Sequence, residues 1–195
     1  MDLSRVYLHN VVETASFGGG TRLFRIPTDV RVALNERARF VALRHAGTEI
    51  RFVTDSPVVR VTLSCHNSDN EILVFKGSHF HSSHRIPHGA MNTLQLEDQP
   101  QMKRIRPEVY EAAPFSPDVW RIMLASNETL FHEIDTLGHS FRPPRGDEMP
   151  RTRWLAYGSS ITNGTGASSH TNCYIQQAAQ RLGWDVMNCG LSGAC

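Results

Sequence analysis

Two stretches of small residues could do chemistry together. "GSSIT" (158–162) follows the apolar run "WLAY" and holds two adjacent serines, while "NCGLSG" (188–193) follows the apolar run "WDVM". A serine where a parallel strand meets a helix can expose its hydroxyl, and its backbone N–H can stabilise an oxyanion. Glycines in the second loop let a backbone N–H approach a reacting group closely. The pattern favours a nucleophilic serine, although Ser159 and Ser160 could also only satisfy backbone groups in a loop.

Residues 151–195 have the pattern of a βαβ unit, which would bring both loops to one edge of a sheet. "RWLAYG" and "WDVMNCG" are predicted strands. Between them a helix is predicted, because apolar residues recur at the spacing of one helical face: Ile175, Ala178, Ala179 and Leu182. Gly183 fits its C-terminal cap, and Thr171 or Asn172 its N-cap. One helix cannot cover both faces of a parallel sheet, so this unit is interpreted as the opening of a larger flavodoxin-like α/β domain.

Taken together, the two loops resemble the first two sequence blocks of the SGNH/GDSL hydrolases. "GSSIT" matches the G-D-S-[LI] nucleophile block, and "NCGLSG" matches the N-x-x-x-x-G block. The resemblance puts the nucleophile at Ser160 and an oxyanion-hole glycine at Gly193, with the Ser160 N–H as another donor and a structural role for Asn188. Ser159 stands where most members have aspartate, and "GSSIT" is typical of a subgroup with an N-terminal β-sandwich.

The resemblance implies a serine esterase or acyltransferase that acts on O-acyl esters of small or carbohydrate-like substrates, with no metal or organic cofactor. Family members also need an asparagine from a G-x-N-D block and a base from a D-x-x-H block, but this sequence stops two residues after Gly193. "DTLGH" (135–139) lies upstream in the wrong order and is interpreted as part of a hairpin. Because a serine without a base is a poor nucleophile, we expect a truncated hydrolase that is close to inactive in this form.

Residues 1–141 have an apolar pattern of period two, which predicts a jelly-roll-like β-sandwich. Two sets of residues should face the core: Val59, Val61 and Leu63, and Trp120, Ile122 and Leu124. Arg121 and Met123 should point outward. Further predicted strands are "RFVAL", "TEIRFVTD", "NEILVFKG" and "NTLQLE". The proline-rich stretch 142–150 is interpreted as a linker, so the predicted fold is mostly β with an incomplete α/β domain at 151–195.

Two other sequence patterns and one other class of protein are consistent with parts of the sequence. In "SHFHSSHRIPH", His79 and His81 could share a strand face with His84 or His88 nearby, but no cysteine or carboxylate adjoins them and we expect no metal. "NGTGASS" lacks the third glycine of a dinucleotide loop. The alternative function is a non-catalytic β-sandwich module that binds carbohydrate.

Composition narrows the partners. The 195 residues hold 20 basic and 19 acidic residues, so no strong charge favours nucleic acid or an anionic membrane. No apolar run reaches the roughly 18 residues of a membrane helix, and no secretory signal is recognised. The four cysteines lack disulfide or metal spacing: Cys65, Cys173, Cys189 and Cys195. We therefore expect a cytoplasmic protein whose partner is a small-molecule or carbohydrate ester, while the oligomeric state is left open.

Overall fold

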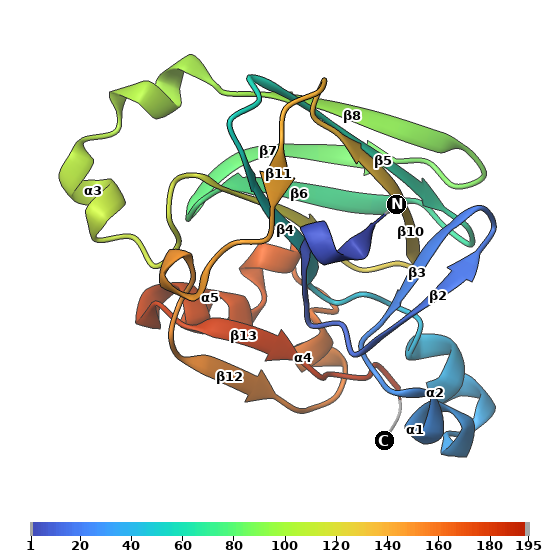
Figure 1. Cartoon of the computed structure of the whole chain (residues 1–195). Coiled ribbons are helices and arrows are strands. Elements are labelled where there is room, and N and C mark those ends of the chain that lie inside the picture. Colours follow the sequence, from blue (N-terminus) through green and yellow to red (C-terminus); the bar gives the residue numbers. More distant parts are fainter. Residues whose placement is uncertain (1, 194–195) are drawn as a thin grey trace.

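A computed structural model describes residues 2–193. Two antiparallel sheets face each other around the main core (Figure 1). The first sheet has the order β1 (Tyr7–His9), β4 (Thr48–Thr54), β9 (Val119–Leu124), β6 (Asn70–Lys76) and β7 (His79–Ile86), with β11 (Phe141–Arg142) also beside β4. The second has the order β2 (Glu13–Phe17), β3 (Gly20–Phe24), β10 (Thr129–Asp135), β5 (Val58–Cys65) and β8 (Met91–Glu97). The predicted fold class, mostly β with a sandwich, is confirmed.

The core lies between the inner faces of the two sheets. Strand β5 contributes Val59, Val61 and Leu63, and β9 contributes Trp120, Ile122 and Leu124, all of them buried. Alternate side chains of a strand point to opposite faces, so period two in the sequence places each set of three residues on the inner face of its own sheet. Burial of this apolar surface, at about 25 cal/mol per Å², is the main favourable contribution to folding.

One predicted strand is a helix. "RFVAL" (39–43) overlaps α2 (Glu36–Val41), which follows α1 (Thr28–Ala33). The Asn35 side chain accepts a hydrogen bond of 2.8 Å from the Ala38 N–H and so caps α2. Ala38 and Val41, three residues apart, are the buried pair, and Phe40 is exposed. The cap and the helical spacing outweigh the short apolar run. Other short helices are η1 (Leu3–Arg5), η2 (Pro100–Arg104) and α3 (Pro107–Glu111).

The C-terminal region forms the predicted βαβ arrangement. Parallel strands β12 (Arg153–Ala156) and β13 (Asp185–Asn188) flank α4 (Ser160–Asn163), η4 (His170–Asn172) and α5 (Tyr174–Leu182). Helix α5 ends at Gly183, whose φ of 66° suits glycine, as predicted. Its N-cap is Cys173, not Thr171 or Asn172, because η4 occupies those positions. Ile175 and Ala179 are buried as predicted, whereas Leu182 is 54% exposed.

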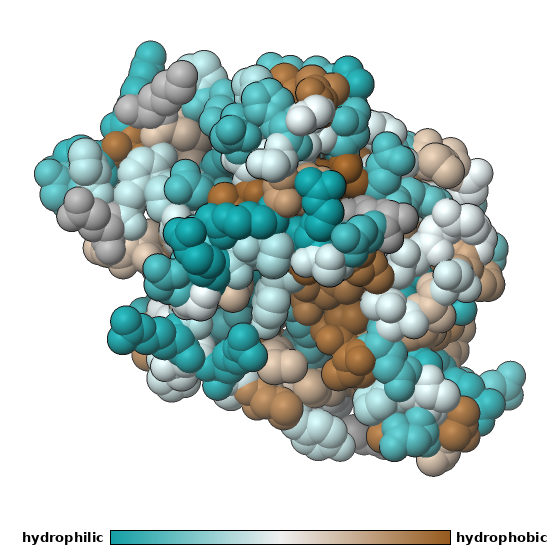
Figure 2. Space-filling model, in the orientation of Figure 1, coloured by the Kyte–Doolittle hydropathy of each residue, from teal (hydrophilic) through white to brown (hydrophobic). Residues whose placement is uncertain are grey.

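This βαβ region covers the outer face of the first sheet. Met123 points away from the sandwich core, as predicted, yet it is buried beside Leu73, Ala125 and Phe75. The face of β12 turned away from α5 is open, with Leu155 61% exposed. In the view of Figure 1, hydrophobic side chains gather to the right of the β12–β13 pair, where the chain runs toward β2 (Figure 2). No helix among residues 2–193 is both long and apolar enough to cross a membrane.

The stretch 142–150, interpreted from its prolines as a linker, is ordered by hydrogen bonds between its own residues. It contains η3 (Gly146–Glu148), and Arg142 also belongs to β11. The buried Glu148 carboxylate accepts hydrogen bonds of 2.8 and 2.7 Å from Arg142 and one of 2.6 Å from the Arg145 N–H. These bonds lower the pKa of Glu148 to about 2 although burial opposes them. The segment is therefore a structured connection.

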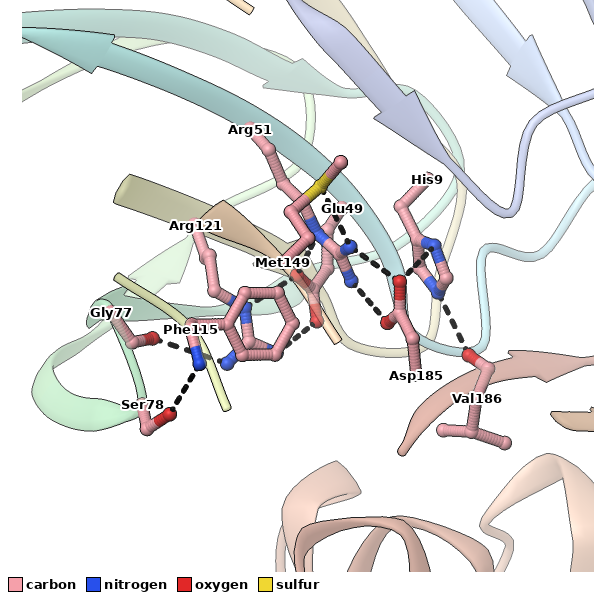
Figure 3. A network of polar contacts seen from close by, with 10 residues as sticks. All are labelled: His9, Glu49, Arg51, Gly77, Ser78, Phe115, Arg121, Met149, Asp185 and Val186. Atoms are coloured by element: carbon pink, nitrogen blue, oxygen red, sulfur yellow. Dashed lines mark hydrogen bonds and ion pairs between the residues drawn. The ribbon is translucent and has the colours of Figure 1, made fainter. Parts of the chain in front are cut away.

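A buried ionic network joins the first sheet to β13 (Figure 3). Arg51 on β4 donates two hydrogen bonds of 2.7 Å to Asp185, the first residue of β13, and a third of 2.7 Å to Glu49. Arg121 on β9 also binds Glu49, at 2.6 Å. Burial raises the pKa of Asp185, but hydrogen bonding and charge from Arg51 outweigh it and lower the pKa. Two arginines thus face two carboxylates, so no buried charge is left alone.

Replacing Asp185 tests this network. Asp185→Asn leaves two buried arginines, Arg51 and Arg121, with the single carboxylate of Glu49, so one positive charge is uncompensated and the free energy of unfolding should fall by about 3–5 kcal/mol. The control is Asp135→Asn. Asp135 forms an ion pair with Arg60 at 3.8 Å, and their side chains are 40% and 45% exposed, respectively. An exposed pair should cost at most about 1 kcal/mol. Urea unfolding measures both, and equal losses would contradict the network's role.

Candidate active site

The turn after β12 places Ser160 at the C-terminal end of the parallel pair. Ser160 is the first residue of α4, and Ser159 precedes it as the N-cap. The Asn163 N–H donates to the Ser159 carbonyl at 3.0 Å, and the Thr165 N–H donates to the Ser160 carbonyl at 2.9 Å. Ser160 is partly exposed, and no group in residues 2–193 hydrogen-bonds to its hydroxyl. The hydroxyl therefore remains available to a ligand.

The loop after β13 lies against the loop that carries Ser160. The Cys189 N–H donates to the Ala156 carbonyl at 2.8 Å, and the Leu191 N–H donates to the Gly158 carbonyl at 3.0 Å. Further on, the hydroxyls of Thr165 and Ser192 are 3.0 Å apart. The structure thus brings "GSSIT" and "NCGLSG" together at one edge, as the βαβ pattern predicts. Gly193 ends this loop with a φ of 69°, a conformation that favours glycine.

The Asn188 side chain connects the two loops through hydrogen bonds. It is completely buried, and its side-chain amide donates to the Thr162 carbonyl in α4 at 2.9 Å. Its side-chain oxygen accepts from the Gly190 N–H, also at 2.9 Å. Both polar groups of the Asn188 side chain are thus bonded to backbone groups of the two loops. Asn188 therefore contributes by holding the loop after β13 in place.

Gly190 allows the closest approach between the loops. A Cβ at this position would lie 2.5 Å from the Asn163 nitrogen and 2.9 Å from the Thr162 carbonyl carbon. Both are backbone atoms, which cannot swing away as the end of a side chain can. The sequence signal for this contact is the glycine that follows "NC", a residue type expected where two backbones meet.

Three polar side chains of the sandwich form hydrogen bonds to the backbone of β13 and of the loop after it. None of these contacts is predicted from the sequence. His9 bonds to the Val186 carbonyl at 2.8 Å, and Asn10 donates to the Asn188 carbonyl at 3.0 Å. Arg25, just after β3, donates to the Asn188 carbonyl at 2.6 Å and to the Gly190 carbonyl at 3.4 Å. No local pattern marks these residues, because their partners lie more than 160 residues away: 177, 178, 163 and 165.

Arg25 places a buried cation beside this loop. Its third hydrogen bond, 2.7 Å long, goes to the Arg44 carbonyl, and no carboxylate in residues 2–193 pairs with it. Burial lowers its pKa to about 10, so the guanidinium stays charged at neutral pH. The guanidinium donates hydrogen bonds to three backbone carbonyls, whose dipoles favour its charge.

No histidine of residues 2–193 hydrogen-bonds to the Ser160 hydroxyl. His170 is buried between two glycines, since a Cβ on Gly164 would lie 3.1 Å from its Nδ1 and one on Gly47 would lie 2.5 Å from its Nε2. Burial lowers the pKa of His170 to about 4, which keeps it neutral. "DTLGH" lies at the end of β10 and the turn after it, where the Leu137 N–H donates to Asp135.

The histidines between 79 and 88 contact other side chains or backbone groups, and His81 and His84 share one hydrogen-bond partner, Ser82. His79 packs edge-on against Tyr110, and His81 packs against Trp120 and bonds to the Glu97 carbonyl at 2.8 Å. His84 bonds to Ser82, and His88 bonds to Asp69, each at 2.8 Å. Among the described residues no three histidines, cysteines or carboxylates are grouped as metal ligands.

Several solved structures share this fold. The salicylyl-acyltransferase of a tetracycline biosynthetic pathway superposes with a TM-score of 0.75 at 15% identity, over 96% of this chain and 53% of that one. A GDSL-like lipase from Bacteroides ovatus gives 0.64 at 17%, over 98% and 56%. A family two carbohydrate esterase from Clostridium thermocellum, in complex with cellohexaose, gives 0.57 at 12%, over 96% and 51%.

The chain has an SGNH-like fold. At these identities the likeness extends to the fold and not to individual residues, so the roles of Ser160 and Gly193 stay predictions. The chain spans about half the length of the structures that it matches, at 53%, 56% and 51%. No protein-family model matches the sequence, and no curated protein matches it.

The close approach at Gly190 predicts an effect of one methyl group. Gly190→Ala forces the loop away from α4 and should cost about 1–3 kcal/mol of unfolding free energy, as overpacking does. Gly146→Ala is the matched control, because a Cβ there meets no atom within 4 Å. Thermal unfolding of both variants gives the comparison. A Gly190→Ala protein as stable as the control would contradict the contact.

Three buried histidines predict a pH dependence. Burial lowers the pKa values of His9, His45 and His170 to about 4, whereas an unfolded histidine titrates near 6.5. Between these values the unfolded chain binds protons that the folded chain does not. The contribution of these histidines to the free energy of unfolding is therefore fully present above about pH 6.5. It falls as the pH approaches 4, by about 1.4 kcal/mol per pH unit for each histidine.

Urea unfolding at a series of pH values measures this slope. His139→Gln is the control, because His139 is exposed and its variant should keep the same slope. His45→Gln should reduce the slope by about one proton. A stability that stays constant from pH 6.5 to 4.5 would show that these histidines become protonated without unfolding.

Proposed function

We propose that Ser160 is the nucleophile of an SGNH-type serine esterase or acyltransferase. The observation that carries the proposal is the junction of the two loops. The Leu191 N–H reaches the Gly158 carbonyl at 3.0 Å, so the "NCGLSG" loop lies beside the turn that presents the Ser160 hydroxyl. In open α/β sheets, ligands bind at this carboxyl end of the strands. The hydroxyl itself has no hydrogen-bond partner in residues 2–193.

In the proposed reaction the Ser160 oxygen attacks the ester carbonyl carbon. The N–H groups of Ser160 and Gly193 hold the resulting oxyanion, together with an asparagine from outside these 195 residues. A base from outside these residues takes the Ser160 proton and passes it to the departing alcohol. Water or a second alcohol then takes the acyl group from the serine, which separates hydrolysis from acyl transfer. Arg25, through the Asn188 and Gly190 carbonyls, keeps the loop in position.

For the substrate we propose an O-acyl ester of a small or carbohydrate-like alcohol. The solved structures that share the fold include a salicylyl-acyltransferase and a carbohydrate esterase, which supports a proposal that leaves both acyl transfer and hydrolysis open. The sandwich would shape the crevice from the side of Asn10 and Arg25. As the alternative, a non-catalytic module would bind carbohydrate through the sandwich and be indifferent to Ser160.

A fluorophosphonate probe tests the nucleophile. In a chain extended through the G-x-N-D and D-x-x-H blocks, the probe should form a stable adduct on Ser160, located by peptide mass spectrometry. Ser160→Ala should abolish the adduct, while Ser159→Ala, the adjacent matched control, should keep it. Equal labelling of the Ser160→Ala protein, or an adduct on another residue, would refute the assignment.

The 195-residue chain alone should behave differently. A serine without its base loses on the order of 10⁶-fold in kcat in other serine hydrolases, so hydrolysis of p-nitrophenyl acetate should hardly exceed that of the Ser160→Ala variant. Rapid, Ser160-dependent turnover by the 195-residue chain would show that a base lies within it.

A further inference from the structure

A cavity of about 270 Å³ lies between the outer face of the first sheet and helix α5. It adjoins Asp185, at the start of β13, whereas the loop that faces Ser160 begins after Asn188, at the other end of the same strand. Three residues of strand separate these ends by about 10 Å. The cavity is therefore distinct from the candidate active site. Figure 3 shows three residues of its wall, Phe115, Ser78 and Arg121.

The charged groups in the wall are already paired. Glu49 binds Arg121 at 2.6 Å and Arg51 at 2.7 Å, and Asp185 binds Arg51 at 2.7 Å. Arg121 is also covered by the Phe115 ring, whose centroid lies 3.9 Å from the guanidinium carbon. A charged ligand would lose its hydration without gaining a free counter-charge. The cavity is thus suited to a neutral molecule.

The wall offers flat apolar surface. Phe75, Phe115, Met123 and Trp184 line the cavity, and Phe80 stands at its edge, 56% exposed. Aromatic faces pack against the C–H groups of a ring through dispersion and burial of apolar area. At 270 Å³ the cavity is slightly smaller than the range of about 300–1,000 Å³ for drug-sized ligands. It has room for a single ring.

Polar groups without charge complete the wall. The Ser78 hydroxyl oxygen accepts from the Phe115 N–H at 3.2 Å, which leaves its proton free to be donated. Gln176 and Gln180 of α5 also line the cavity, and among the described residues neither side-chain amide has a hydrogen-bond partner. An amide both donates and accepts, as a hydroxyl does. The wall therefore combines apolar faces with groups that match several hydroxyls.

We propose that this cavity binds the neutral ring of one monosaccharide unit. Uncharged hydroxyls would meet Ser78, Gln176 and Gln180, and the C–H face of the ring would lie against the aromatic side chains. The ligand would contact both the sandwich and α5, so its binding would stabilise their association. This proposal does not depend on Ser160 as a nucleophile.

Titration followed by two-dimensional NMR of the 195-residue chain tests the site, with methyl β-D-glucopyranoside and methyl β-D-xylopyranoside as probes. At least one should give saturable shifts of the Gln176 and Gln180 side-chain amides and the Trp184 indole. The charged methyl β-D-glucopyranosiduronate should bind at least about tenfold more weakly, since no free cation awaits it. Gln176→Leu and Gln180→Leu should each weaken binding about fivefold or more.

Two controls isolate the cavity. Gln95→Leu removes a matched exposed glutamine from β8 on the second sheet and should leave the affinity unchanged, as should Ser160→Ala. Absence of saturable shifts up to about 100 mM of either neutral glycoside, enough to detect a millimolar Kd, would overturn the proposal. Binding that survives both glutamine variants would overturn it too. Tighter binding of cyclohexanol than of both glycosides would refute the sugar class.

Discussion

The buried guanidinium of Arg51 is the constraint on which the rest of the structure depends. The Arg51 side chain has no exposed surface, and the cost of burying its charge is compensated by two carboxylates within hydrogen-bond distance. Glu49 comes from its own strand, but Asp185 comes from β13, 134 residues further along the chain. Once this pair forms, the first residue of β13 is held against the outer face of the sandwich. The bidentate geometry sets both its distance and its direction.

From that anchor the position of the candidate site follows along β13. His9 holds the Val186 carbonyl, and Arg25 holds the Asn188 and Gly190 carbonyls. The loop that follows is thereby pressed onto α4, where only glycine fits at 190. The sandwich thus contributes to the site by positioning it. Both the proposed nucleophile and the neutral-ring cavity lie along one strand, at its two ends, and both depend on the same contacts.

The sequence predicts elements whose signal is local. Period two in β5 and β9 shows the sandwich core, and Gly183 shows the end of α5. The prediction fails where a short apolar run competes with a cap, as at Asn35 and "RFVAL". The prolines of 142–150 give no sign of the hydrogen bonds to the buried Glu148 carboxylate. The sequence does not predict the contacts of Arg25 and Arg51, because their partners are distant in the chain. Motif spacing suggests Ser160, and the structure adds its neighbours but not its reactivity.

Native-state hydrogen exchange tests most directly whether these contacts make the sandwich and the βαβ region one unit. The amides to compare are those of Cys189 and Leu191, bonded to Ala156 and Gly158, and that of Ile122 in the core. If the contacts couple both parts, all three amides should exchange through global unfolding, with opening free energies within about 1 kcal/mol of each other. Opening of Cys189 and Leu191 at a small fraction of the free energy of Ile122 would contradict the account.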